Sequence, residues 1–130
     1  MEIKLTNKES EDVFHDSLCN GLPYLSGYGL SIDYKREEYQ KAKASFIEKN
    51  PKRTPCYEDI LMEILFVGGN LLLDDSEDPE SVISINLNDV HEKVSNTDGR
   101  HLLDAIQERG DAITADCVLQ TVFLGDIIYG

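Results

Sequence analysis

Alternation of apolar and polar residues marks several short segments of the chain. Side chains of a β-strand point to opposite faces in turn, so a half-buried strand carries an apolar residue at every second position. This spacing predicts strands at residues 2–6, 28–34 and 82–87, and the apolar run 71–73 predicts a fourth. The last two segments flank an acidic stretch, a pattern typical of a β-hairpin.

Apolar residues three to four positions apart predict helices in most of the remaining chain. The first helix is expected to start at Asn7 or Ser10 and to run through Cys19. The dipeptide Asn20-Gly21 is expected to end it, because glycine readily adopts the left-handed conformation found after helices. A second helix is expected over residues 37–47.

A third helix is predicted to begin at Thr54-Pro55. Threonine can accept a hydrogen bond from a free amide there, and proline lacks an amide that the first helical position does not need. The dipeptide Gly68-Gly69 is expected to end this helix. Three further helices are predicted. One covers residues 89–95 after an Asn88 cap, one is capped by Thr97 or Asp98 and runs through Arg109 before Gly110, and one covers residues 117–128. Residues 126–129 fit a strand equally well.

Strands interleaved with helices predict an α+β fold. We expect a small antiparallel or mixed sheet of about four strands, packed by four to six helices. The length of 130 residues is typical of one domain, so residues 1–130 are expected to form a single globular unit around one core.

The chain is strongly acidic, with a formal net charge of −13. Such a charge repels phosphate groups, so direct binding to nucleic acid or to anionic membranes is disfavoured. The charge is uneven, because residues 35–53 hold seven bases and three acids, a local charge of +4 that leaves −17 for the rest. This basic segment is interpreted as a solvated helix face; the alternative is that it contacts an acidic neighbour in a homo-oligomer.

Cellular location and cofactors are constrained by what the sequence lacks. Its three cysteines fit neither a disulfide framework nor a zinc motif. The start of the chain has no apolar run of signal-peptide length, and the apolar stretches 60–67 and 117–125 are far shorter than the roughly 20 residues of a membrane span. We therefore expect a cytoplasmic protein. Phosphate-binding, dinucleotide-binding and hydrolase motifs are missing, and no cofactor is expected.

The most acidic stretch lies between the two predicted hairpin strands and contains Asp74, Asp75, Glu77, Asp78 and Glu80. Clustered carboxylates are the ligands that calcium and magnesium prefer. The stretch lacks the glycine and the ligand spacing of an EF-hand loop, however, so a solvated hairpin tip is favoured over a cation site. These five residues are our first candidate for an interaction surface.

A second group of candidates lies in the C-terminal third of the chain. It consists of His101, Asp104, Asp111 and Asp116. On a helix His101 and Asp104 share one face, and the two later aspartates can approach them across the Gly110 turn. Such a group is an acid–base or metal-binding hypothesis, whereas the favoured interpretation is structural, with Asp111 as a helix cap.

Cys56 is expected in the first turn of a helix, a position that stabilises a thiolate. A nucleophilic thiol also needs a base, and no local motif links His15, His91 or His101 to it. A structural cysteine is therefore favoured.

An interaction module is favoured over an enzyme. The main hypothesis is an inhibitor, adaptor or regulatory subunit whose acidic surface binds a basic protein, with mimicry of nucleic acid as one version. Mimicry needs rows of carboxylates, and the candidates for those rows are Glu9, Glu11, Asp12 and Asp16, or Asp89, Glu92, Asp104 and Glu108. The alternatives are a metal-assisted hydrolase or nuclease that uses the C-terminal cluster, and a structural protomer of a larger assembly.

Overall fold

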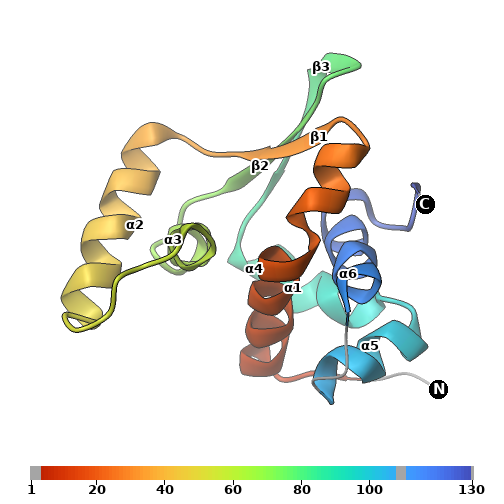
Figure 1. Ribbon diagram of the computed structural model, residues 1–130, viewed down its shortest axis with the longest axis horizontal. Helices are drawn as coiled ribbons and strands as arrows, with labels where there is room; N and C mark the ends of the chain where they lie inside the picture. The colour runs from red at the N-terminus through yellow and green to blue at the C-terminus, as the bar shows by residue number, and fades with distance from the viewer. Residues whose placement is uncertain (1–3, 108–110, 130) are drawn as a thin grey trace.

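The computed structural model describes residues 4–107 and 111–129, and it has an α+β architecture. In chain order the elements are α1 (Asn7–Gly27), β1 (Leu30–Asp33), α2 (Arg36–Lys49), α3 (Tyr57–Phe66), β2 (Leu71–Asp75), β3 (Asp78–Ile85), α4 (Leu87–Lys93), a 3-10 turn (Val94–Asn96), α5 (Gly99–Ile106) and α6 (Ala112–Leu124). Figure 1 shows α2 and α3 next to each other on the left and α1, α4, α5 and α6 grouped on the right. The predicted α+β class is confirmed.

The sheet has three strands in the described part of the chain, where about four were predicted. The missing strand is the one expected at residues 2–6. Thr6 instead begins α1, because its Oγ1 accepts a hydrogen bond from the amide of Glu9 at 3.1 Å while the Glu9 carboxylate accepts one from the amide of Thr6 at 2.9 Å. This reciprocal cap fixes the start of a helix. Residues 1–3 of the predicted strand lie outside the described residues.

The three strands are antiparallel in the order β1-β2-β3. Their register places Ile32 opposite Leu73, and Leu73 opposite Ile83, so these apolar side chains share the face that packs on the core. The other face carries Ser31 opposite Asp74. Apolar and polar residues thus separate onto the two faces as the period-two pattern requires.

The first helix continues past its predicted end and includes Pro23. Gly21 does not end the helix but lies where α1 packs against α6. A Cβ at Gly21 would come within 2.8 Å of Leu119 Cδ1 and 3.1 Å of the Ala115 carbonyl carbon. Glycine is therefore required by the close helix contact, and the extra turns are held by packing although proline removes one intrahelical hydrogen bond.

Two other helix starts differ from the prediction by two residues. Cys56, not Thr54, is the N-cap of α3, because the Asp59 carboxylate accepts a hydrogen bond from the Cys56 amide at 3.2 Å. Asn86, not Asn88, caps α4, since its side chain accepts from the amide of Asp89 at 3.0 Å. In both cases the carboxylate three positions later accepts a hydrogen bond from the amide of the cap residue, which favours that residue as the start of the helix.

The C-terminal part confirms a buried helix. α6 is buried along most of its length and ends at Gly125, whose φ of 83° is left-handed. Gln120 Oε1 then accepts hydrogen bonds from the amides of Ile128 and Tyr129, both at 2.8 Å, so the segment after α6 folds back on the helix and forms no strand. The predicted stop at Gly110 lies outside the described residues.

A hydrophobic cluster joins α1, α3, α6 and the core face of the sheet. Phe14, Leu61, Ile64 and Leu119 are fully buried in it. None of the helices in residues 4–107 and 111–129 has the length and apolar character that crossing a bilayer requires.

Candidate functional site

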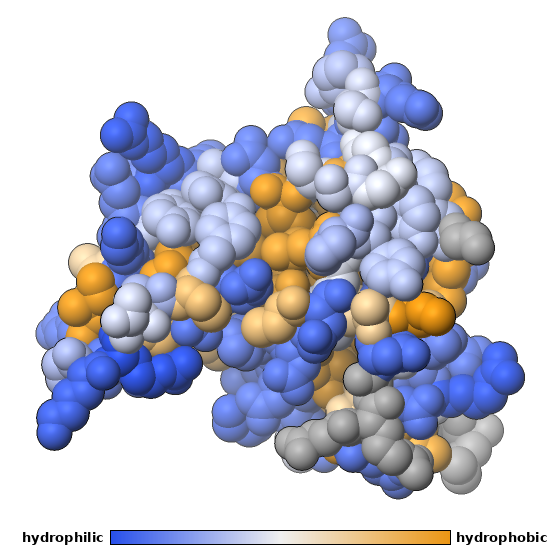
Figure 2. Space-filling view, viewed as in Figure 1, coloured by the Kyte–Doolittle hydropathy of each residue, from blue (hydrophilic) through white to orange (hydrophobic). Residues whose placement is uncertain are grey.

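The acidic stretch predicted as a loop is the end of a β-hairpin. β2 continues through Asp75 and β3 begins at Asp78, so only Ser76 and Glu77 form the turn. We call residues 74–80 the acidic tip. Figure 1 shows that it projects away from the helices, and Figure 2 shows hydrophilic side chains at the end of this projection. The predicted hairpin is confirmed, and its loop is shorter than the acidic stretch because strand pairing continues to Asp75 opposite Asp78.

The carboxylates of the acidic tip have no cationic partner among the residues that the structure describes. Glu77, Asp78 and Glu80 are exposed, and no ion pair between described residues includes any acid of residues 74–80. The Asp75 side chain accepts a hydrogen bond from the amide of Glu77 at 2.9 Å, which holds the turn. Like charges opposite each other in a sheet repel, so a tip with Asp75 beside Asp78 gains no stability from its charges. These acids are therefore available to a partner.

Asp74 and Asp75 are both half-buried, and Asp74 lies on the outer face of the sheet. Burial raises the pKa of the Asp74 carboxyl, and the nearby Asp33 carboxylate raises it further. The two aspartates lie on the same face of neighbouring strands, since Asp74 pairs with Ser31 and Asp33 is two residues further along β1. A positive charge brought to this place would relieve the repulsion.

A larger set of charged residues lies in a cleft between α1, α2 and α3, which we call the ionic cleft. Its volume is about 370 Å³. His15 Nε2 lies 2.9 Å from Asp59 Oδ1, and Arg53 Nη2 lies 3.3 Å from Asp59 Oδ2. Lys49 Nζ donates to Glu63 Oε2 at 2.7 Å. Both acids are buried and both are paired, in contrast to the acidic tip.

Asp59 is held as a carboxylate by its surroundings. Burial by itself would raise the pKa of this group, but hydrogen bonds from Cys56 and His15 outweigh burial and lower the pKa below its ordinary value. Sequence reasoning did not find the contact between His15 and Asp59, which are 44 residues apart. The only local signal was the position of Asp59 in the first turn of a helix.

Cys56 lies at the edge of the same region, with its thiol exposed. Partial desolvation is the largest influence on the Cys56 thiol and raises its pKa. The same cause raises the pKa of Cys19 to about 11. A raised pKa leaves little thiolate at neutral pH, so the arrangement provides no activated nucleophile.

The structure brings two residues of the C-terminal cluster, His101 and Asp111, into contact with Thr114. Asp111 caps α6 by accepting a hydrogen bond from the Thr114 amide at 2.9 Å, and this bond lowers the pKa of its carboxyl. His101 Nδ1 lies 3.5 Å from Thr114 Oγ1. Asp104 lies on α5, where it also has an interaction partner.

Asp116 faces a different part of the molecule. It is buried and accepts hydrogen bonds from the Tyr28 hydroxyl at 2.8 Å and from Gln120 Nε2 at 3.0 Å. Burial and the bond to Asp116 raise the pKa of Tyr28 to about 12. Within the described residues no group of three or more His, Cys, Asp or Glu side chains is placed to hold a metal ion.

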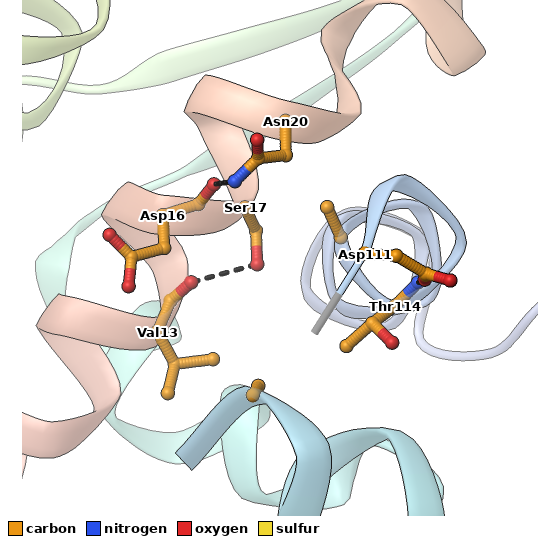
Figure 3. A pocket seen from close by; sticks show the side chains of 8 residues that line it. Val13, Asp16, Ser17, Asn20, Asp111 and Thr114 are labelled. Carbon is orange, nitrogen blue, oxygen red and sulfur yellow. Dashed lines mark hydrogen bonds between the residues drawn. The ribbon is translucent and has the colours of Figure 1, made fainter. Parts of the chain in front are cut away.

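A smaller cavity of about 210 Å³ lies between α1, α5 and α6. Figure 3 shows Asp16, Ser17 and Asn20 of α1 on one side and Asp111 and Thr114 on the other. Two of its polar groups bond within α1: Ser17 Oγ donates to the Val13 carbonyl at 2.7 Å, and Asn20 Nδ2 donates to the Asp16 carbonyl at 2.9 Å.

Comparison with known proteins adds no assignment. The chain matches no protein-family model, no curated protein and no solved structure.

Proposed function

We propose that this protein is an interaction module that binds a basic region of another protein through the acidic tip of the β2–β3 hairpin. A single observation supports the proposal: the acids of the tip project from the body and form no ion pair within the described residues. Elsewhere the exposed and buried acids are often paired, as for Asp12 with Lys8 and Glu63 with Lys49. Unpaired carboxylates on a projection attract a basic surface and accelerate the encounter with it.

The basic segment of the chain lies away from this tip. Lys41 and Lys43 are exposed on α2, which Figure 1 shows at the opposite end of the sheet from the end of the hairpin. No ion pair between described residues joins this basic segment to the tip, so its charges do not neutralise the tip by direct contact.

Mimicry of nucleic acid is a narrower version of the same function, and the described side chains give it little support. On α1 the proposed row of acids is interrupted, because Asp12 pairs with Lys8 at 2.8 Å and Glu11 lies 2.7 Å from His91 Nε2. In the second row Asp89 lies 3.5 Å from Lys93, and Glu108 is outside the described residues. We therefore place the contact with the partner on the hairpin.

The proposal is tested by capture of partners from a lysate of the source cell with three forms of the tagged protein. The wild type is compared with a tip variant, in which Asp75→Asn, Glu77→Gln, Asp78→Asn and Glu80→Gln are combined. The matched control removes four exposed acids elsewhere, Asp16→Asn, Glu37→Gln, Glu48→Gln and Glu92→Gln. Net charge changes equally in both variants, so any difference between them reports position.

We expect the wild type and the control to retain one basic protein at low salt and to release it near 1 M salt, where the screening length is about 3 Å. The tip variant should not retain it. The proposal fails if the control loses the partner as completely as the tip variant does. It also fails if the wild type retains no basic protein and runs as a closed oligomer, which would favour the structural protomer.

A further inference from the structure

The outer edge of β1 is a second surface with the geometry of a binding site. Among the described strands β1 pairs only with β2, so one of its edges is free. The amide of Ser76 donates to the Gly29 carbonyl at 2.9 Å. This bond shows that Gly29 faces β2. Residues along an antiparallel strand face its two edges in turn, so the amide and carbonyl groups of Leu30 and Ile32 face the free edge. Those groups are the ones an added strand would use.

The other edge of the sheet is protected against such pairing. β3 contains Pro79, which has no amide to donate, between the acidic residues Asp78 and Glu80. Proline and charge are common means of keeping edge strands from pairing. β1 has no proline, and its one charged residue is Asp33.

A small apolar pocket of about 150 Å³ lies beside the free edge. Leu22 and Leu25 of α1, Leu30 and Ile32 of β1, and Tyr57 of α3 line it. Figure 2 shows apolar side chains gathered in the middle of the visible face, in the hollow between α3 and α1. The pocket has the chemistry to accept one aliphatic side chain.

Tyr57 forms the outer wall of this pocket and remains 41% exposed. It is supported from behind by Tyr34 and Tyr39, whose rings stack with centroids 4.8 Å apart and lie 6.2 and 6.4 Å from that of Tyr57. Exposed aromatic rings fixed by neighbours lose little freedom on binding, so they are favourable anchors for a partner.

The opposite face of the sheet has the complementary chemistry. Asp33 is exposed there, and Asp74 lies beside it on β2. Successive side chains of an added strand point to opposite faces, so a residue next to one that enters the pocket would face these two carboxylates. Cross-strand neighbours lie about 5 Å apart, which is close enough for a lysine or arginine to contact Asp33.

We propose that the free edge of β1 binds an extended segment of a partner protein in which aliphatic and basic residues alternate. The segment pairs with the backbone of Leu30 and Ile32, places one aliphatic side chain against Tyr57, and places the adjacent basic side chains over Asp33 and Asp74. This surface shares Asp74 with the acidic tip. Its occupation does not depend on the function proposed for the tip, whose test leaves Asp74 unchanged.

The proposal is tested by titrating the full chain with short blocked peptides and following backbone amide shifts by NMR. The probe is Lys-Val-Lys-Val-Lys. The control peptides are Lys-Lys-Lys-Val-Val, which has the same composition without alternation, and Glu-Val-Glu-Val-Glu, which has the opposite charge. We expect the probe alone to shift the amides of Leu30 and Ile32 in a saturable way.

Two variants locate the contact, and the NMR spectrum of each variant shows whether it is folded. Ser26→Trp fills the pocket from its exposed rim and should abolish the shifts. Asp33→Lys should weaken binding about tenfold, the result of replacing an attractive cross-strand pair by a repulsive one. The matched control is Asp78→Lys at the other edge, which should change affinity by less than about twofold, as expected for a distant exposed charge.

Three results would overturn the proposal. One is equal binding of the probe and the unalternated peptide, and another is equal weakening by Asp33→Lys and Asp78→Lys. The third is that no peptide binds, while the wild-type chain self-associates and Ser26→Trp abolishes this self-association. That result would identify a second copy of the chain as the occupant. Because Asp33→Lys leaves the acidic tip intact, capture of a basic protein through the tip is unaffected by failure here.

Discussion

Asp59 and Asp74 are both carboxylates with limited exposure to water, but their surroundings shift their pKa values in opposite directions. In the ionic cleft Asp59 receives hydrogen bonds from Cys56 and His15, and its pKa is lowered. On the hairpin Asp74 meets Asp33, and its pKa is raised. This contrast separates the acids that support the fold of this very acidic chain from those that do not. Acids with donors around them stabilise the folded state, whereas acids that face other acids oppose it.

The largest effect is expected from removal of the Asp59 carboxylate. Asp59→Ala leaves His15 and the Cys56 amide without their acceptor inside the ionic cleft. We expect a loss of about 2–3 kcal/mol in the free energy of unfolding, the cost of breaking a buried hydrogen-bonded pair. Urea unfolding followed by circular dichroism measures it. The control Asp12→Ala breaks the exposed pair with Lys8 and should cost under about 0.5 kcal/mol. Equal losses would remove the distinction between a buried and an exposed ion pair.

The Asp59 carboxylate should also make the stability of the fold depend on pH. Since the pKa of Asp59 is lower in the folded than in the unfolded state, its contribution is fully present above the unfolded value of about 4. It is lost as the pH falls through the folded value. Wild-type protein should therefore lose more stability than Asp59→Asn when the pH is lowered from about 5 to about 3. Parallel pH profiles of the two proteins would contradict the assignment.

Asp74→Asn should act in the opposite direction. The raised pKa means that the folded state binds the proton more tightly, so the ionised carboxylate destabilises the fold once the pH exceeds its folded pKa. At pH 7 the variant should be more stable than the wild type by up to about 1 kcal/mol, the size of a like-charge cross-strand pair. The gain should disappear in acid. Thermal unfolding at pH 7 and in acid tests this. The control Asp16→Asn changes an exposed carboxylate and should alter the stability little.

The smallest effect on stability is expected from the tip variant described above. Its four acids have no ion pair to lose within the described residues, so the free energy of unfolding should change by less than about 0.5 kcal/mol. A slight gain at low ionic strength should vanish at high salt. A large loss would show that the tip is structural, and it would weaken the case for a surface kept free for binding.

Elements with strong local signals could be predicted from the sequence. The spacing of Ile60, Leu61, Ile64 and Leu65 identifies the buried stripe of α3, and the structure buries all four. The alternation in residues 82–87 identifies β3, with Ile85 on the core. Turn and cap positions were less certain because several residues compete for them, as Asn86 and Asn88 do at α4.

Features that join distant segments were missed or misread. Gly21 resembles a helix end in the sequence, and only the approach of α6 explains why α1 continues beyond it. The pairing of Asp75 with Asp78 extended the hairpin at the expense of the predicted loop. The contact of His15 with Asp59 has no signal in either local sequence.

The α+β class, the amphipathic stripes and the strong local concentration of acids could all be read from the amino-acid order. These follow from hydrophobic periodicity and from charge, which act between near neighbours along the chain. Tertiary structure alone decided which acids acquire donors and which remain unpaired, and that the edge of β1 lies beside an apolar pocket while Pro79 and its acidic neighbours protect the edge of β3. The reason is that solvation and pairing of a charged group depend on everything within a few ångströms of it, and those neighbours come from parts of the chain far apart in sequence.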